Sequence, residues 1–176
     1  EAGDDHPKYR QTLPSLLRIA RATDADTSVL SRIEDYSPDI YPPDFQDELH
    51  FLVGQYHFGE GNLDAALMRF NEVSENDSDL FVRARYLSGV IHVQLSKLQV
   101  EPEKADAEQL KLAAKAFKAI LREQRGGLSS DTVDRVSAMA TLALGRLFFS
   151  TRQYAVAVRY YDQVTQDDDD WLDSLF

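Results

Sequence analysis

The sequence contains no cysteine among its 176 residues. This absence excludes disulfide bonds, zinc–thiolate sites, iron–sulfur clusters and a cysteine nucleophile. It does not select a cellular compartment, because exported and cytosolic proteins can both lack cysteine. The bacterial periplasm or cell envelope is therefore one alternative for the location of this protein, and the cytoplasm is the other.

Proline and glycine are also scarce, with 6 and 8 residues, which favours long helices over a fold of strands and tight turns. No run of about eighteen apolar residues occurs, so we expect no membrane insertion of this segment. Basic residues are in the minority, because 19 Lys and Arg stand against 30 Asp and Glu, for a net charge of −11. Such a surface repels phosphate backbones and anionic lipids. We therefore do not expect nucleic acid as a partner.

What the sequence does contain is a repeated pattern of small and aromatic residues. A glycine is followed by an alanine, and an aromatic residue comes four positions later, in Gly54…Ala66…Phe70, Gly89…Ala113…Phe117 and Gly145…Ala157…Tyr161. In the first and third copies the alanine follows the glycine by twelve residues. Two antiparallel helices joined by a short turn produce this gap when both small residues lie where the helices touch. Helix axes approach to about 8–10 Å only over small side chains, so the pattern predicts stacked helical hairpins.

The first 44 residues lack this pattern. Residues 1–8 are polar, and we expect a disordered tail there. Apolar residues at helical spacing predict a helix pair, over 9–22 and 27–36. Three prolines in 37–44 predict an extended connector, and Asp44 is the expected N-cap of the helix that follows.

Three repeats of two helices each are predicted over residues 45–170. The first repeat has its expected helices at 45–59 and 63–75, with the turn at Gly59–Asn62. The first helix of the second repeat is expected from near Val82 to Leu95 or beyond. Its second helix, at 109–124, follows an insertion near 96–108.

The third repeat is expected to begin its first helix at Thr132, with Ser130 or Asp131 as the cap. Its second helix starts at Gln153–Tyr154 and ends before Asp167. Residues 171–176 carry apolar side chains at Trp171, Leu172, Leu175 and Phe176 and predict the start of a further, truncated helix, so we expect a fragment of a longer array.

These residues resemble those of the tetratricopeptide repeat family. The first copy matches at Val53, Gly54, Gly61, Asn62, Leu63, Ala66 and Phe70; the second at Gly89, Ala113 and Phe117; and the third at Leu144, Gly145, Phe148, Tyr154, Ala157, Tyr161 and Val164. The copies are degenerate, with an insertion in the second, and they depart from the family at His57, Val73, Ser78 and Asp169. The resemblance implies an all-α fold, a right-handed superhelical array of antiparallel helix pairs.

In that family the first helices line a concave face, and the resemblance implies which residues would lie on it. The implied partner-binding groove consists of Glu48, Phe51, Gln55, Phe58, Arg83, Tyr86, Val90, Gln94, Met139, Leu142, Arg146 and Phe149. Aromatic residues would supply contact area to a bound protein or peptide, and the two arginines would pair with a carboxylate. The alternative is that several of these side chains pack on the N-terminal helix pair or on the insertion, because aromatic stripes at helical spacing more often belong to a core.

Catalytic and metal-binding motifs are missing from the sequence. It has no glycine-rich phosphate loop, no Gly-x-Ser-x-Gly and no His-Glu-x-x-His. His50 and His57 lie seven residues apart, about 10 Å along a helix, which is too far for one metal ion without other ligands. The run Asp167–Asp170 lacks the glycine and the closing glutamate of a calcium loop. We expect no catalytic residue, no metal and no cofactor.

The resulting hypothesis is a non-enzymatic scaffold that binds a partner protein or peptide through the concave face of the array. Self-association through the C-terminal end is a further expectation, because residues 171–176 carry unpaired apolar side chains. The alternative is a ligand- or peptide-sensing regulatory domain of a larger multidomain protein.

Overall fold

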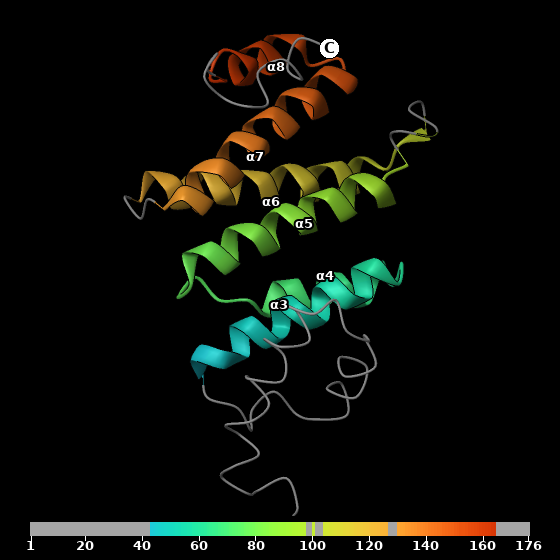
Figure 1. Ribbon diagram of the computed structural model, residues 1–176. Helices are drawn as coiled ribbons and strands as arrows, with labels where there is room; N and C mark the ends of the chain where they lie inside the picture. Colours follow the sequence, from blue (N-terminus) through green and yellow to red (C-terminus); the bar gives the residue numbers. More distant parts are fainter. Residues whose placement is uncertain (1–42, 98–99, 101–103, 127–129, 165–176) are drawn as a thin grey trace, which may run out of the picture. The chain divides into compact units, whose positions relative to one another are not determined.

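The computed structural model describes residues 43–97, 100, 104–126 and 130–164. Over these residues the chain forms α-helices and no strand: α3 (Pro43–Gly59), α4 (Leu63–Glu72), α5 (Ser78–Leu95), α6 (Ala107–Arg125), α7 (Asp131–Ser150) and α8 (Tyr154–Tyr161) (Figure 1). The expected fold class, an all-α array of antiparallel helix pairs, is confirmed. The predicted tail, the helices at 9–22 and 27–36 and the truncated helix at 171–176 lie outside the described residues.

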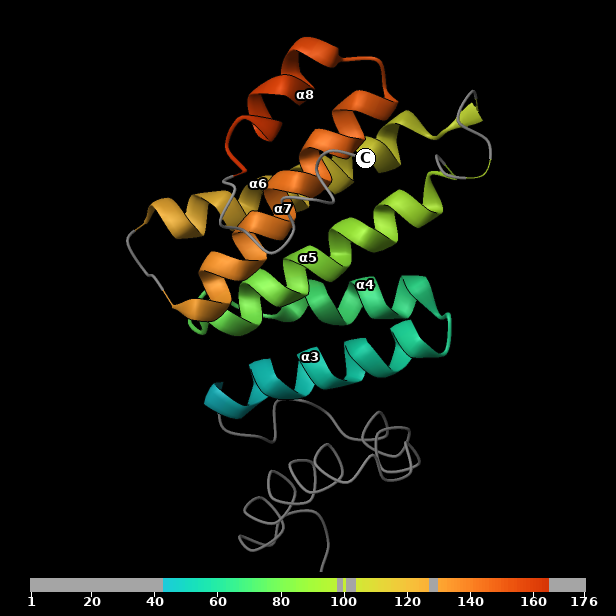
Figure 2. The same ribbon diagram turned by 45° about the horizontal axis from the view of Figure 1, so that its top comes forward.

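The described helices belong to two compact units, which divide between Val73 and Ser74. The first unit contains the hairpin of α3 and α4. The second contains two hairpins, α5 with α6 and α7 with α8, and α6 and α5 both contact α7 (Figure 2). Each unit therefore has its own core.

The hairpin of the first unit closes over Gly54. A β-carbon added to this glycine would lie 2.6 Å from Cε1 of Phe70, so only glycine allows the ring to lie against α3. Ala66, one turn before Phe70 on α4, is fully buried. Gly54 thus lies where α3 meets α4, as the spacing predicts, and the group that it meets is the Phe70 ring.

The same arrangement occurs twice in the second unit. An added β-carbon would lie 2.4 Å from the Phe117 ring at Gly89 and 2.6 Å from the Tyr161 ring at Gly145. The core of the unit is continuous across α5, α6 and α7, and its buried members are Phe81, Val82, Ala113, Phe117, Ile120, Leu121, Val133, Val136, Ala140 and Leu144. The twenty-four-residue gap in the second copy therefore yields the same helix contact as the twelve-residue gaps.

The turn after α3 is a Schellman motif. Gly61 has φ +78°, a left-handed conformation that suits glycine. The amide of Asn62 donates to the carbonyl of His57 at 2.9 Å, and that of Gly61 donates to Phe58 at 3.2 Å. The turn after α7 repeats this geometry with Arg152 in the glycine position, at φ +61°.

Helix caps set the helix starts in the second unit. Ser130 caps α7, because its hydroxyl oxygen accepts a hydrogen bond from the amide of Val133 at 3.0 Å. It is one of the two residues predicted as the cap of this helix. Asp77 caps α5 through the amide of Leu80, which places the helix start earlier than the expected Val82. Asp44 is not a cap: α3 begins at Pro43, a residue whose fixed φ suits the first turn of a helix.

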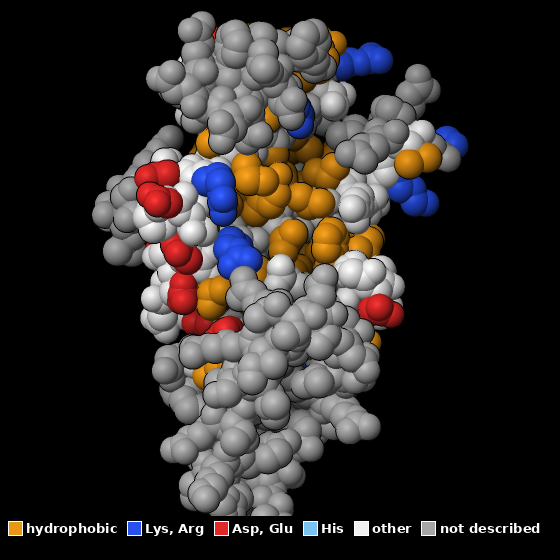
Figure 3. Space-filling model, viewed as in Figure 1, with side chains coloured by type: hydrophobic (Ala, Val, Ile, Leu, Met, Phe, Trp, Pro, Cys, Tyr) orange, Lys and Arg blue, Asp and Glu red, His pale blue; other side chains and the backbone are white. Residues whose placement is uncertain are grey.

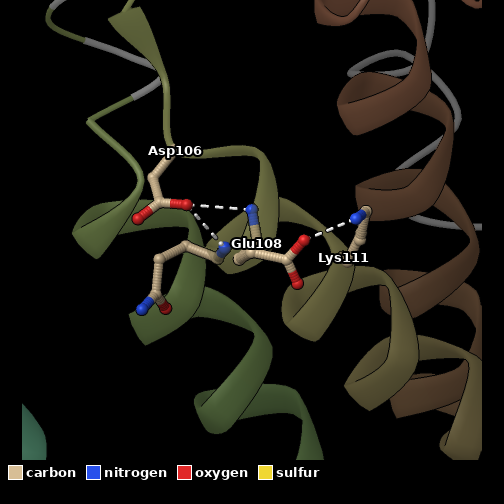
Figure 4. Close-up of polar contacts among 4 residues, drawn as sticks. Asp106, Glu108 and Lys111 are labelled. Atoms are coloured by element: carbon tan, nitrogen blue, oxygen red, sulfur yellow. Dashed lines mark hydrogen bonds and ion pairs between the residues drawn. The ribbon is translucent and has the colours of Figure 1, made fainter.

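The insertion in the second repeat is tied together at its base. Ser96 follows α5, and its carbonyl accepts a hydrogen bond from the amide of Asp106 at 3.0 Å. The Asp106 side chain then caps α6, accepting from the amides of Glu108 at 2.8 Å and Gln109 at 3.3 Å (Figure 4). The insertion thus leaves and re-enters the hairpin at one point, and α5 and α6 pair through the same glycine contact as the other hairpins.

Candidate partner-binding surface

The three repeat glycines give α3, α5 and α7 a common register. Positions in the three helices are equivalent when they are counted from Gly54, Gly89 and Gly145. Four such positions lie on one side of each helix: six and three residues before the glycine, and one and four residues after it. They hold Glu48, Phe51, Gln55 and Phe58 on α3; Arg83, Tyr86, Val90 and Val93 on α5; and Met139, Leu142, Arg146 and Phe149 on α7. The predicted groove contains all of these except Val93, together with Gln94.

The position three before the glycine faces the core. Phe51 is only 1% exposed, and its ring lies 5.9 Å from that of Phe70. The half-buried Tyr86 lies 5.7 Å from Phe117 in the same way, and Leu142 is also buried. Phe51 and Leu142 were expected on an open groove, and the structure corrects this. Phe51 and Tyr86 pack beside the aromatic ring that covers the glycine, so the hairpin itself occupies these two side chains.

The other positions reach the surface to differing degrees. Glu48, Phe58, Arg83, Val90, Val93 and Met139 are half-buried, whereas Gln55, Gln94 and Arg146 are exposed. Phe149 is 57% exposed, and its ring meets that of Tyr154 edge-on at 5.4 Å. These side chains are therefore available to a second molecule to an extent that Phe51 and Leu142 are not.

The second unit brings the members from α5 and α7 together. The two helices contact each other, and Tyr86, Val90 and Val93 lie against the core as partly buried hydrophobic residues. Hydrophobic side chains gather over this part of the unit, with Lys or Arg along one edge (Figure 3). The members from α3 belong to the first unit and form a separate set.

Several aromatic and charged contacts were not predicted. The Arg85 guanidinium lies 4.9 Å from the centre of the Phe81 ring; burial lowers the pKa of Arg85, while Glu75 opposes that shift. Lys118 lies 5.4 Å from the ring of Phe148, which stacks on Tyr160 at 5.6 Å. Two pairs of adjacent aromatic residues, Phe148-Phe149 on α7 and Tyr160-Tyr161 on α8, were the sequence signal that could have predicted this stack.

Burial also acts on a tyrosine next to the candidate surface. The pKa of Tyr161 is raised by burial of its phenol, and the positive charge of Arg146 partly offsets this rise. Arg146 therefore places positive charge near the end of the third hairpin.

The histidines among the described residues are buried or half-buried. His50 and His57 are buried on α3, and Nδ1 of His92 lies 2.7 Å from Oε1 of Gln109, joining α5 to α6. Among the residues described, no group of three or more His, Cys, Asp or Glu is placed to hold a metal ion. None of the described helices is both long and apolar enough to cross a membrane.

Comparison with known families adds one match. Residues 102–170, which include α6, α7 and α8, match the family model of the tetratricopeptide repeat. No curated protein matches the chain, and no solved structure matches it. The repeats of this family generally mediate protein–protein interaction, and their fold is typically a non-enzymatic scaffold.

Proposed function

From the tetratricopeptide repeats that this chain carries, we propose that it is a non-enzymatic interaction module. The surface of α5 and α7 in its second unit binds a protein or peptide segment. One observation carries the proposal: on the contacting helices α5 and α7, the half-buried Val90 and Val93 keep apolar area at the surface and Arg146 is exposed.

The chemistry of the surface selects the kind of segment. Partly exposed apolar side chains gain free energy when a second molecule removes them from water, about 25 cal/mol for each Å² of apolar area. Arginine adds charge-assisted hydrogen bonds to a carboxylate, often with two parallel bonds. A segment that alternates aliphatic or aromatic residues with Asp or Glu fits both features.

The net charge of the protein sharpens this specificity. With a net charge of −11, the chain as a whole repels an acidic segment, and basic side chains provide the local sites where an acidic segment is attracted. Arg83 on α5 and Arg146 on α7 supply such sites on the proposed surface. These two charges would orient an acidic, apolar segment on the proposed surface.

A peptide library displayed on phage and selected against the whole chain tests the proposal. Selected peptides should combine apolar residues with Asp or Glu. Their binding should be lost in Arg146→Glu and in Val90→Asp. The matched control is Arg122→Glu, which makes the same charge change on the exposed surface of α6 and should leave binding within about twofold, because an exposed charge outside the proposed surface contributes little.

Two results would contradict the proposal. One is that no peptide is enriched over the library background. The other is that the selected peptides bind Arg146→Glu and Val90→Asp as tightly as the unaltered chain. Circular dichroism of each variant must show the helical content of the unaltered chain, so that a loss of binding is not a loss of folding.

A further inference from the structure

The outer side of α8 presents a second apolar surface. Tyr154 and Val158 lie four residues apart on this helix and are 53% and 54% exposed, and Phe149, near the end of α7, meets the Tyr154 ring. Residues four apart in a helix lie on one face. The three side chains therefore form a continuous patch, here called the α8 patch.

Comparison with α6 shows what this face does one repeat earlier. Ala157 follows Ala113 by 44 residues, so Tyr154 and Val158 are the equivalents of Leu110 and Ala114. Leu110 and Ala114 are half-buried, because α6 packs against α5 and α7 together. In contrast, α8 packs against α7 and has no further helix after it in the described part of the chain. The α8 patch corresponds to a face that is partly covered in the preceding hairpin.

Charge indicates what would cover it. Residues 152–161 contain Arg152 and Arg159 and no acidic residue, and both arginines are exposed. The sequence of residues 167–176 is the complement: five aspartates, no basic residue, and the apolar residues Trp171, Leu172, Leu175 and Phe176. An apolar surface with basic neighbours thus precedes an apolar segment with acidic neighbours.

We propose that residues 167–176 bind the α8 patch of the same chain, with the aspartates near Arg152 and Arg159. The connection is long enough. Nine residues, 162–170, separate α8 from Trp171, and an extended chain of that length reaches about 30 Å. The eight residues of α8 span about 12 Å.

The only tryptophan of the chain lies in the proposed segment, so its fluorescence reports on the contact. In the whole chain, Trp171 should emit at the shorter wavelengths of a buried indole and resist quenching by acrylamide. Val158→Asp should shift the emission to longer wavelength and increase the quenching constant. Leu112→Asp, at a 40% exposed apolar residue of α6, is the matched control and should change neither.

Disulfide cross-linking distinguishes a contact within one chain from a contact between two chains. Because the chain has no native cysteine, only the introduced cysteines can form the cross-link. Val158→Cys combined with Leu175→Cys should form an intrachain disulfide on mild oxidation, seen as a faster monomer band on a non-reducing gel. Leu112→Cys combined with Leu175→Cys should not. A disulfide-linked dimer, or Trp171 burial that depends on protein concentration, would assign the patch to a second copy and overturn the proposal. A fully quenchable Trp171 in the unaltered chain would overturn it as well.

Discussion

Gly89 and Phe117 are in such close contact that a β-carbon on the glycine would lie 2.4 Å from Cε1 of the ring. Phe117, on α6, is almost fully buried in the core that α5 and α6 share. Gly145 and Tyr161 have the same relationship, but Tyr161 is half-buried at the surface of the last hairpin. The contact is the same in both, whereas the freedom of the ring to move away differs.

Gly89→Ala should therefore destabilise the second unit by about 1–3 kcal/mol, the usual cost of overpacking. Gly145→Ala should cost less, because the Tyr161 ring can shift toward solvent. Gly59→Ala is the control: nothing lies within 4 Å of an added β-carbon there, so the free energy of unfolding should not fall. Urea unfolding followed by circular dichroism measures all three. Equal losses in Gly89→Ala and Gly59→Ala would contradict the packing argument.

The turn after α7 places a non-glycine residue in a left-handed conformation, with Arg152 at φ +61°. This conformation costs about 1–2 kcal/mol for a residue with a β-carbon, and glycine loses part of that gain through its freer unfolded chain. Arg152→Gly should raise the free energy of unfolding by up to about 1 kcal/mol. Arg152→Ala removes the charge but keeps the β-carbon, so it should give no such gain in thermal unfolding. Stabilisation by both variants would point to charge instead.

Ser130 joins two helices of the second unit. Its oxygen caps α7 through the amide of Val133, and its hydroxyl donates to the carboxylate of Asp79 on α5. Ser130→Ala should cost about 1–2 kcal/mol, the range for loss of an N-cap. Asp79→Ala removes only the second bond and should cost less. A double-mutant cycle on thermal unfolding measures their coupling, and strictly additive losses would show that the two residues act independently.

The raised pKa of Tyr161 predicts a loss of stability at high pH. An unfolded tyrosine loses its proton near pH 10, whereas burial keeps the folded phenol protonated to higher pH. Above pH 10 the folded state binds more protons than the unfolded state, so the free energy of unfolding falls as pH rises through the folded pKa. The contribution is fully present below pH 10.

Tyr161→Phe tests this pH dependence, because it should flatten the fall in unfolding free energy above pH 10 relative to the unaltered chain. Arg146→Ala should raise the pKa of Tyr161 further, since the arginine opposes the effect of burial. Carbon-13 NMR of the labelled phenol ring follows the titration. A pKa that drops in Arg146→Ala would contradict the assigned causes.

The spacing of small residues was a reliable guide to the hairpins. Because a helix contact depends on what lies at the point of closest approach, a glycine, an alanine and an aromatic ring in sequence were enough to predict which helices pair. In the structure the repeat glycines do lie at these contacts, where Gly54 meets the Phe70 ring and Gly145 meets the Tyr161 ring. Capping at Ser130 was equally local, and the structure confirms it.

The candidate surface was less predictable for a geometric reason. Phe51 and Phe149 are both aromatic residues on one side of a first helix, but Phe51 is 1% exposed and Phe149 is 57% exposed. Periodicity defines a helix face only to within a wide angle, and the second helix of the hairpin covers part of that angle. The residue three positions before the glycine lies beside an aromatic ring of that second helix, as Phe51 lies beside Phe70.

For the described residues, the pairing of the helices and the repeat register could be derived from the sequence, because both depend on side-chain size and spacing along one chain. Which side chains of that register remain open to a partner could be learned only from the packed helices. The exposure of a side chain depends on atoms from helices that are distant in sequence. For example, the Phe117 ring on α6 packs against Tyr86 on α5 and covers part of it.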